Sequence, residues 1–116
     1  MSSKVSFEGI GEVTATFYAA DGVKSGDMVK LTGDSTVAGC AAGERFCGVC
    51  VSAGDGYAAV QVGGMMEAVC DDSTVSAGYV TLTADGAGGV KKAGSGDSGD
   101  EYLVIRAGDG TVTLKM

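Results

Sequence analysis

The chain has 116 residues, of which 45% are apolar, 21 are glycine and none is proline or tryptophan. This length suits one domain, which buries roughly two-thirds of the surface that its unfolded chain exposes. A formal net charge of −7 argues against binding to nucleic acid, because contacts with phosphates need clustered lysine and arginine.

No stretch approaches the roughly 20 consecutive apolar residues that cross a bilayer, and residues 1–6 lack the apolar segment of a signal peptide. We therefore expect no membrane partner, and synthesis in a cytosol, where the four cysteines are thiols by default. The acidic residues fall mainly in predicted turns and indicate a solvated surface that keeps the protein soluble.

Scattered apolar residues and glycines fill residues 1–12, which we interpret as an N-terminal arm or edge strand ahead of a single β domain over 13–116. Apolar and polar residues then alternate from Val13 to Ala19, which predicts the first strand, and Asp21-Gly22 ends it. Similar patterns predict further strands at 28–32, 36–40, 46–52, 57–62, 65–70, 75–83, 90–92, 101–107 and 111–116.

Two of these strands have patterns that predict which side chains are buried. In the strand at 28–32, alternation points Val29 and Leu31 toward the core and Lys30 toward solvent. The strand at 46–52 has no charged residue, so we expect it to be buried on both faces.

The tetrapeptide Ala-Gly-Asp-Gly occurs twice, at 53–56 and at 107–110, each time between two predicted strands. Asp-Gly supplies residues that tolerate positive φ, so both copies predict β-hairpins. Residues 75–83 also repeat the pattern of 23–32. Together these features predict an all-β fold, a small barrel or sandwich of about nine to ten short strands. It would consist of two pseudo-repeated halves, about 23–70 and 75–116.

The cysteines are the first candidates for chemistry. Cys47 and Cys50 have the CxxC spacing of zinc knuckles and redox enzymes, but they lie inside a predicted strand rather than at a helix N-terminus. Alternation along a strand would place their side chains on opposite faces of the sheet. We therefore expect Cys40, Cys47, Cys50 and Cys70 to be small buried core residues. A zinc site and a disulfide are the alternatives.

The sequence offers little else for catalysis. Histidine is absent, which removes the usual general base, the common nucleophile pairs and most catalytic zinc sites. Neighbouring carboxylates such as Asp71 and Asp72 lie in a predicted solvated turn. Residues 94–101 loosely resemble a calcium-binding loop but lack its ligand spacing, so a solvated linker is the better interpretation. We expect no enzymatic activity, no cofactor and no metal.

The remaining possibility is a surface that binds other proteins. The candidates for oligomer or host-surface contact are apolar residues near the predicted edge and after the Gly63-Gly64 break: Val5, Phe7, Ile10, Tyr18, Met65 and Met66. Consecutive strand residues point to opposite faces, so one of the two methionines should be exposed. A purely structural alternative is that these residues cap the two ends of a barrel. In the functional interpretation, the N-terminal arm adds a strand to a partner sheet.

Residues 26–31, 42–49 and 55–64 resemble small bacteriophage and prophage head proteins, above all the capsid decoration or cement proteins. The resemblance covers residues 23–115. It implies a non-enzymatic all-β protein that binds the major capsid protein on the outside of an icosahedral shell, as a symmetric homo-oligomer with a trimer favoured. It also implies synthesis in the bacterial cytoplasm and a final location on the capsid surface of the virion. It implies no catalytic residues.

Two other functions stay open. A tail- or fibre-associated module that binds a receptor or carbohydrate would need an exposed aromatic platform, for which the candidates are Tyr18, Tyr57, Tyr79 and Tyr102. A self-assembling structural protein would instead form a tube or filament through paired strand edges.

Overall fold

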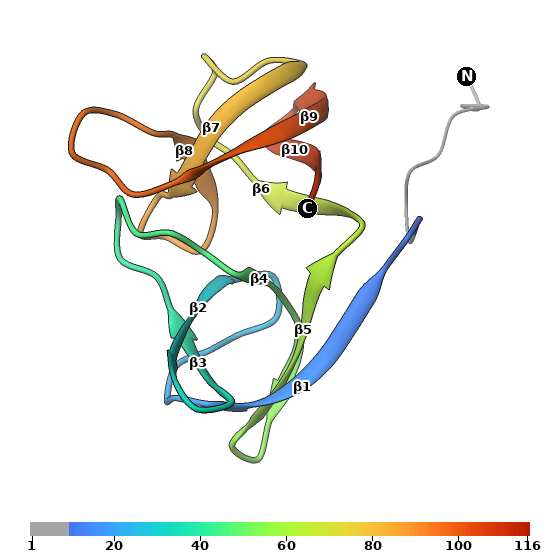
Figure 1. Ribbon diagram of the computed structural model, residues 1–116, viewed down its shortest axis with the longest axis vertical. Helices are drawn as coiled ribbons and strands as arrows, with labels where there is room; N and C mark the ends of the chain where they lie inside the picture. Colours follow the sequence, from blue (N-terminus) through green and yellow to red (C-terminus); the bar gives the residue numbers. More distant parts are fainter. Residues whose placement is uncertain (1–9) are drawn as a thin grey trace.

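Every regular element in the part of the chain that the computed structural model describes, residues 10–116, is a β-strand (Figure 1). The prediction of an all-β fold with a barrel is confirmed. The strands are β1 (Val13–Ala19), β2 (Met28–Gly33), β3 (Thr36–Gly39), β4 (Gly48–Gly54), β5 (Tyr57–Gly63), β6 (Met65–Val69), β7 (Gly78–Ala84), β8 (Val90–Lys92), β9 (Asp100–Gly108) and β10 (Thr111–Lys115). No helix suited to crossing a membrane occurs among these residues.

The strands form two sheets. β1 to β5 form a closed barrel in the order β1-β3-β2-β4-β5, and β6 to β10 form an open sheet in the order β6-β10-β9-β7-β8. Figure 1 looks down into the barrel, with the second sheet above it. The chain crosses from one to the other at Gly64. The carbonyl of Gly64 accepts a hydrogen bond from Met116 N–H (3.0 Å), and the N–H of Met65 donates to the Ile10 carbonyl (2.9 Å).

The second sheet repeats the connectivity of the barrel. The barrel pairs β1–β5, β5–β4, β4–β2 and β2–β3 recur as β6–β10, β10–β9, β9–β7 and β7–β8. Both copies have a register shift at the same place, because Val51 in β4 and Ile105 in β9 have no partner on the neighbouring hairpin strand. The predicted repeat is therefore a repeat of whole five-stranded units. The two units divide at Gly64, earlier in the chain than the division expected between residues 70 and 75.

The two copies differ in how their outer strands meet. In the barrel, Tyr18 and Ala19 of β1 pair in parallel with β3 and close the cylinder. No matching pair joins β6 to β8 within residues 10–116. Gly89, just before β8, nevertheless lies so near β6 that an added Cβ would come within 2.4 Å of the Val69 carbonyl oxygen. The second sheet therefore curls almost to closure without forming the last ladder.

Both predicted hairpins are present, and their turns have the backbone conformation that Asp-Gly favours. The φ angles are 55° at Asp55 and 80° at Gly56, and they are 55° at Asp109 and 78° at Gly110. Positive φ at both central residues matches the right-handed twist of the flanking strands. The repeated tetrapeptide thus fixes the register of β4 with β5 and of β9 with β10.

The interior consists of two apolar clusters, and one of them joins the two units. The barrel cluster contains Val29, Val37, Cys50, Ala58 and Val60. The larger cluster fills the second sheet, and it takes in Met28, Phe46 and Val49 from the barrel unit. Burying each such side chain contributes about 1.5–3 kcal/mol, so these three together matter on the scale of the whole folding free energy, about 5–15 kcal/mol. The two units are therefore one folded body.

Polar contacts reinforce the same junction. The Thr83 hydroxyl is fully buried and lies 3.0 Å from the Glu44 carbonyl oxygen and 2.5 Å from that of Ser98. Arg45 donates through its Nε to the Asp100 carboxylate at 2.7 Å. These bonds tie the loop before β4 to β7 and to the first residue of β9, and they tie β7 to the loop before β9.

Burial agrees with the predicted pattern in the centre of the barrel and departs from it at the ends. Residues Gly48, Val49 and Cys50 are buried as expected, whereas β4 is exposed from Val51 onward. Leu31, which we expected to face the core, is 57% exposed. The reason is that β2 pairs with β4 only through Met28 and Val29, so the rest of β2 extends past the barrel wall.

Candidate functional site

The CxxC cysteines do not form a reactive centre. Cys50 is buried in the barrel cluster, and the half-buried Cys47 packs against the same cluster. The prediction that alternation would place them on opposite faces was wrong, because Cys47 precedes β4 and alternation does not extend to it.

All four cysteines are free thiols. Two of them, Cys50 and Cys70, are buried as predicted, whereas Cys40 and Cys47 are half-buried. Burial raises the pKa of each thiol, and at Cys40 burial together with the nearby Glu44 carboxylate raises the pKa to about 11. A thiol that stays protonated is a poor nucleophile. Each of the four cysteines also belongs to one of the two apolar clusters or packs against it, so they serve as packing residues.

The acidic side chains engage in local hydrogen bonds. Within residues 10–116, no three Cys, Asp or Glu side chains are grouped so that they could hold a metal ion. In the stretch that loosely resembles a calcium loop, Asp97 accepts a hydrogen bond from the Gly94 N–H at 2.8 Å. Asp72 accepts hydrogen bonds from the hydroxyl and N–H of Thr74 and from the Lys92 N–H, and these bonds lower its pKa.

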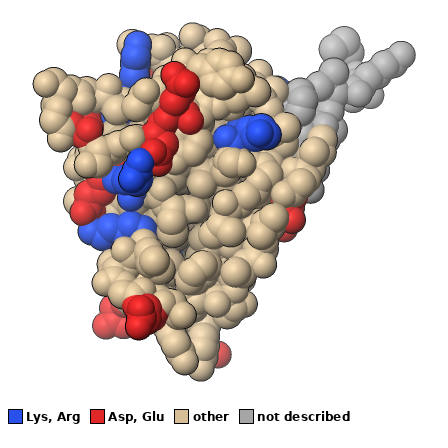
Figure 2. Space-filling view, viewed as in Figure 1, with Lys and Arg blue, Asp and Glu red and all other residues tan. Residues whose placement is uncertain are grey.

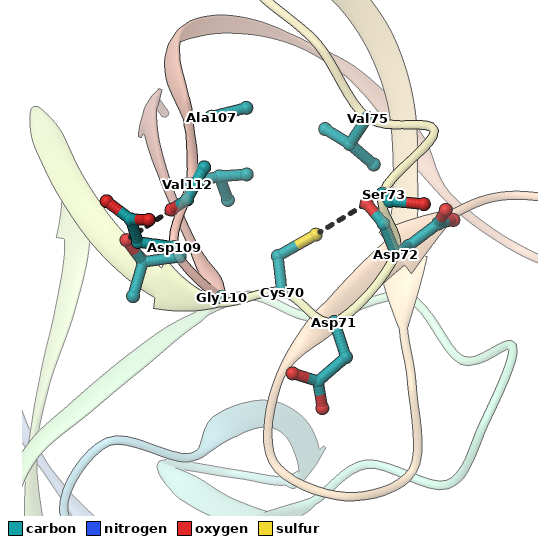
Figure 3. A pocket seen from close by; sticks show the side chains of 11 residues that line it. Cys70, Asp71, Asp72, Ser73, Val75, Ala107, Asp109, Gly110 and Val112 are labelled. Atoms are coloured by element: carbon teal, nitrogen blue, oxygen red, sulfur yellow. Dashed lines mark hydrogen bonds between the residues drawn. The ribbon is translucent and has the colours of Figure 1, made fainter.

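A pocket of about 420 Å³ lies between the second hairpin turn and the turn that follows β6 (Figure 3). The Cys70 thiol points to its wall and donates a hydrogen bond to the Asp72 carbonyl at 3.6 Å. The carboxylates of Asp71, Asp72 and Asp109 point in different directions and do not converge on a common centre (Figure 3). The pocket thus lacks the convergent polar groups that hold and activate a small molecule.

The barrel has a matching pocket of about 180 Å³, between the first hairpin turn and the turn after β1. The same backbone hydrogen bond lies beside each pocket, from Ala19 N–H to the Gly56 carbonyl and from Cys70 N–H to the Gly110 carbonyl, both at 2.8 Å. Both pockets are therefore products of the repeated scaffold. One difference is that Tyr57 lines the barrel pocket, where Thr111 lines the other.

The predicted contact residues do not form one surface. Val5 and Phe7 lie outside the described residues. Ile10 is exposed and lies beside the half-buried Met65 through their backbone hydrogen bond, whereas Tyr18 stands at the opposite end of β1. Met66 is buried in the larger cluster, which removes it from the surface available to a partner. Of the two methionines, Met65 is thus the more exposed.

An uncharged patch on the outside of the barrel is the most distinctive surface. Residues directly opposite one another in an antiparallel pair share a face. Tyr57 pairs with both Tyr18 and Gly54, and Ala59 pairs with both Thr16 and Ser52. We call these six residues the tyrosine face: Thr16, Tyr18, Ser52, Gly54, Tyr57 and Ala59.

The two tyrosines form the centre of this face. Tyr18 is 56% exposed and Tyr57 is 51% exposed. Their ring centroids are 5.6 Å apart, with 32° between the ring planes. Gly54, on the far side of Tyr57, has nothing within 4 Å of the position of a Cβ, which leaves the ring open to a partner. Exposed aromatic rings on a rigid sheet are typical anchors of binding surfaces.

The second sheet provides an internal comparison for this face. There, the positions of Tyr18, Tyr57 and Gly54 are taken by Val69, Thr111 and Gly108. The positions of Thr16, Ala59 and Ser52 are taken by Glu67, Thr113 and Arg106. The same scaffold positions thus carry an acidic and a basic residue in one unit and none in the other. The aromatic pair is likewise absent from these second-sheet positions. The tyrosine face is therefore specific to the barrel unit and is not a general feature of the repeated scaffold.

The distribution of charge supports this distinction. In the view of Figure 2, most charged side chains gather over the second sheet and the loops beside it, whereas the surface over β1 and β5 is largely uncharged. A partner that docks on this face of β1 and β5 therefore meets few charged side chains.

Comparison of the sequence with models of known protein families and with curated proteins finds no match.

Proposed function

We propose that this protein is a non-enzymatic structural protein that decorates and stabilises the outer surface of a phage capsid, bound to the major capsid protein. The observation that carries the proposal is the tyrosine face, an exposed and uncharged patch on a chain of net charge −7. The resemblance of residues 26–31, 42–49 and 55–64 to capsid decoration proteins supports the same role.

The proposed mechanism is additive binding. Tyr18 and Tyr57 would fill apolar recesses between neighbouring capsid subunits, where tyrosine buries a large area at a small cost in conformational entropy. The N-terminal arm would lie along the shell beyond Ile10. Shell symmetry presents many identical sites, and an oligomer of decoration proteins engages several at once, which raises the overall affinity without new contacts.

The test is co-expression of the chain with the major capsid protein of its own genome, followed by sedimentation of the shells. We expect the wild type to co-sediment, and the double variant Tyr18→Ala, Tyr57→Ala to bind at least about ten-fold more weakly, since loss of two aromatic anchors costs more than the 1.4 kcal/mol of one decade. The matched control is Tyr79→Ala, which removes a ring that is 72% exposed on the second sheet. Equal binding by both variants would refute the role of the tyrosine face.

A second experiment concerns the arm. Removal of residues 1–11 deletes none of the strands described in residues 10–116 and removes one described backbone hydrogen bond, from Met65 N–H to the Ile10 carbonyl. We expect it to abolish shell binding without unfolding the domain. A truncated protein that still decorates shells would refute the contribution of the arm. The role of the tyrosine face is decided separately, by the Tyr18→Ala, Tyr57→Ala variant.

The same tyrosine pair also favours a second candidate, a tail- or fibre-associated module that binds carbohydrate. Neighbouring exposed rings can stack on the apolar face of a sugar, and the Tyr18 and Tyr57 rings lie 5.6 Å apart, centroid to centroid. Screening of the protein against immobilised glycans separates the two functions. Glycan binding that is lost in the Tyr18→Ala, Tyr57→Ala variant, together with failure to sediment with shells, would replace the first proposal with the second.

A further inference from the structure

Among the described residues, one edge of β1 has no partner along most of its length. β5 pairs with one edge of β1 from Val13 to Tyr18, whereas β3 pairs with the other edge only at Tyr18 and Ala19. Within residues 10–116, no strand pairs with that second edge from Val13 to Phe17. The barrel is therefore closed at one end of β1 and open to a further strand at the other.

Backbone hydrogen bonds identify the groups that this edge presents. The N–H of Tyr18 donates to the Ser35 carbonyl and that of Ala20 to the Val37 carbonyl, both on the side of β3. Backbone groups alternate between the two edges of a strand, so the N–H and C=O groups of Thr14 and Thr16 point to this side too. Two donors and two acceptors thus lie in a row, ready to pair.

This edge also lacks the features that keep strand edges apart. Proteins usually protect an exposed edge with lysine, another charge or proline. Residues 13–17 read Val-Thr-Ala-Thr-Phe and contain none of these. The two outer strands of the second sheet differ, because β6 carries Glu67 and β8 carries Lys91 and Lys92. On a chain of net charge −7, an uncharged edge is where two copies can approach most closely.

We propose that β1 pairs with β1 of a second copy, antiparallel and centred on Ala15, to form a two-fold symmetric dimer. This register places Thr14 opposite Thr16 of the second copy, and Val13 opposite Phe17 of the second copy. Threonine pairs and pairs of an aromatic with a β-branched residue are favourable across strands. The Thr14–Thr16 pairs use the four free backbone groups, and the short Ala15 side chains meet at the narrow, non-hydrogen-bonded pair on the axis.

The dimer also covers surface that is exposed in one copy. Val13 is 56% exposed and Phe17 is half-buried, and each would pack against the other across the two-fold axis. Thr16 and Tyr18 lie on the tyrosine face, so the pairing would join two tyrosine faces into one surface. The dimer does not depend on what that surface binds, but it would make binding to a repeating partner bivalent.

Light scattering after size exclusion of the full chain tests the pairing. We expect a mass of twice 11.4 kDa for the wild type. Ala15→Lys and Ala15→Glu each place two like charges face to face on the axis, and each should raise the dimer dissociation constant at least ten-fold. An equimolar mixture of the two variants should regain the dimer, because the opposed charges then attract. The matched control is Thr81→Lys, an exposed substitution on β7 of the second sheet, away from the edge, which should stay dimeric.

Several outcomes would overturn the proposal. These are a wild-type monomer or trimer, a dimer that survives both Ala15 variants, or a mixture that stays monomeric while circular dichroism reports native strands. A wild-type monomer that dimerises only after removal of residues 1–9 would assign the edge to the chain's own N-terminal residues. Shell sedimentation is a separate measurement, so a failure of the dimer and a failure of the proposed function are distinguishable.

Discussion

The junction between the barrel and the second sheet makes a strong prediction about Phe46. This side chain is buried in the cluster of the second sheet, and its ring stacks on Tyr102 with the centroids 5.2 Å apart and 14° between the planes. Phe46→Ala should destabilise the whole protein by about 3–5 kcal/mol, from lost apolar transfer and the cavity left behind. Because the variant also loses the ring stack with Tyr102, we expect its cost to lie in the upper part of that range. Aromatic pairs add about 0.5–1.5 kcal/mol beyond area burial.

The destabilisation by Phe46→Ala is measurable because it is a large share of the total free energy of unfolding. A chain of this length is expected to have a free energy of unfolding of about 6–17 kcal/mol. With a guanidinium m-value of roughly 3 kcal/mol/M, Phe46→Ala should lower the unfolding midpoint by about 1–2 M. Far-ultraviolet circular dichroism and tyrosine fluorescence should give coincident single transitions for both proteins.

The matched control is Tyr79→Ala, which removes an exposed aromatic ring and should change the unfolding free energy by less than about 1 kcal/mol. The reasoning would be refuted by a cost below about 1 kcal/mol for Phe46→Ala, or by two separate transitions in the wild type. Either result would mean that the barrel and the second sheet fold independently and merely touch.

Two further predictions concern single contacts. Gly48→Ala should cost about 1–3 kcal/mol or more, because its Cβ would lie 2.3 Å from the Gln61 carbonyl oxygen, whereas Gly33→Ala, with nothing within 4 Å, should be nearly neutral in thermal unfolding. The Glu44 carboxylate accepts hydrogen bonds from Lys30, and these lower its pKa below the ordinary 4.5. Its contribution to stability is therefore present above about pH 4.5 and is lost as the pH falls through the lowered folded-state pKa. Glu44→Gln should flatten the acid limb of the stability profile in urea titrations, and an unchanged limb would contradict this assignment.

Local pattern was enough to predict most of the strands. The alternation at Val13–Ala19 and the run at Val90–Lys92 match observed strands residue for residue. The two Asp-Gly turns were predictable because positive φ at both positions is a local requirement that few other residues meet. Strand ends were less predictable, since β4 begins at Gly48 and β7 at Gly78, each after the residue at which its pattern starts.

Which side chains are exposed, and which lie side by side on one face of a sheet, depends on information that local pattern does not contain. Alternation assigns side chains to two faces, but it does not say where a strand extends beyond its neighbours, as β2 does at Leu31. It also gives no cross-strand register, which is what brings Tyr57 next to Tyr18. Tyr57 was therefore absent from the predicted contact residues, although it was among the four tyrosines named for an aromatic platform. Comparison of the two repeats could have singled out this position, because its counterpart in the second hairpin is Thr111.

The single peptide group between Gly64 and Met65 has a consequence for how the chain could be rewired. Its carbonyl is bonded to the last residue, Met116, and its N–H to the first described residue, Ile10. These two chain positions are thus separated by one peptide plane and two hydrogen bonds, roughly 8 Å from standard bond lengths. A circular permutant that joins residue 116 to residue 10 by a few glycines, with new termini between Gly63 and Gly64, would be translated with the second sheet first and the barrel last. Its spatial arrangement would stay the same, so the order of the two units along the chain is separable from their order in the fold.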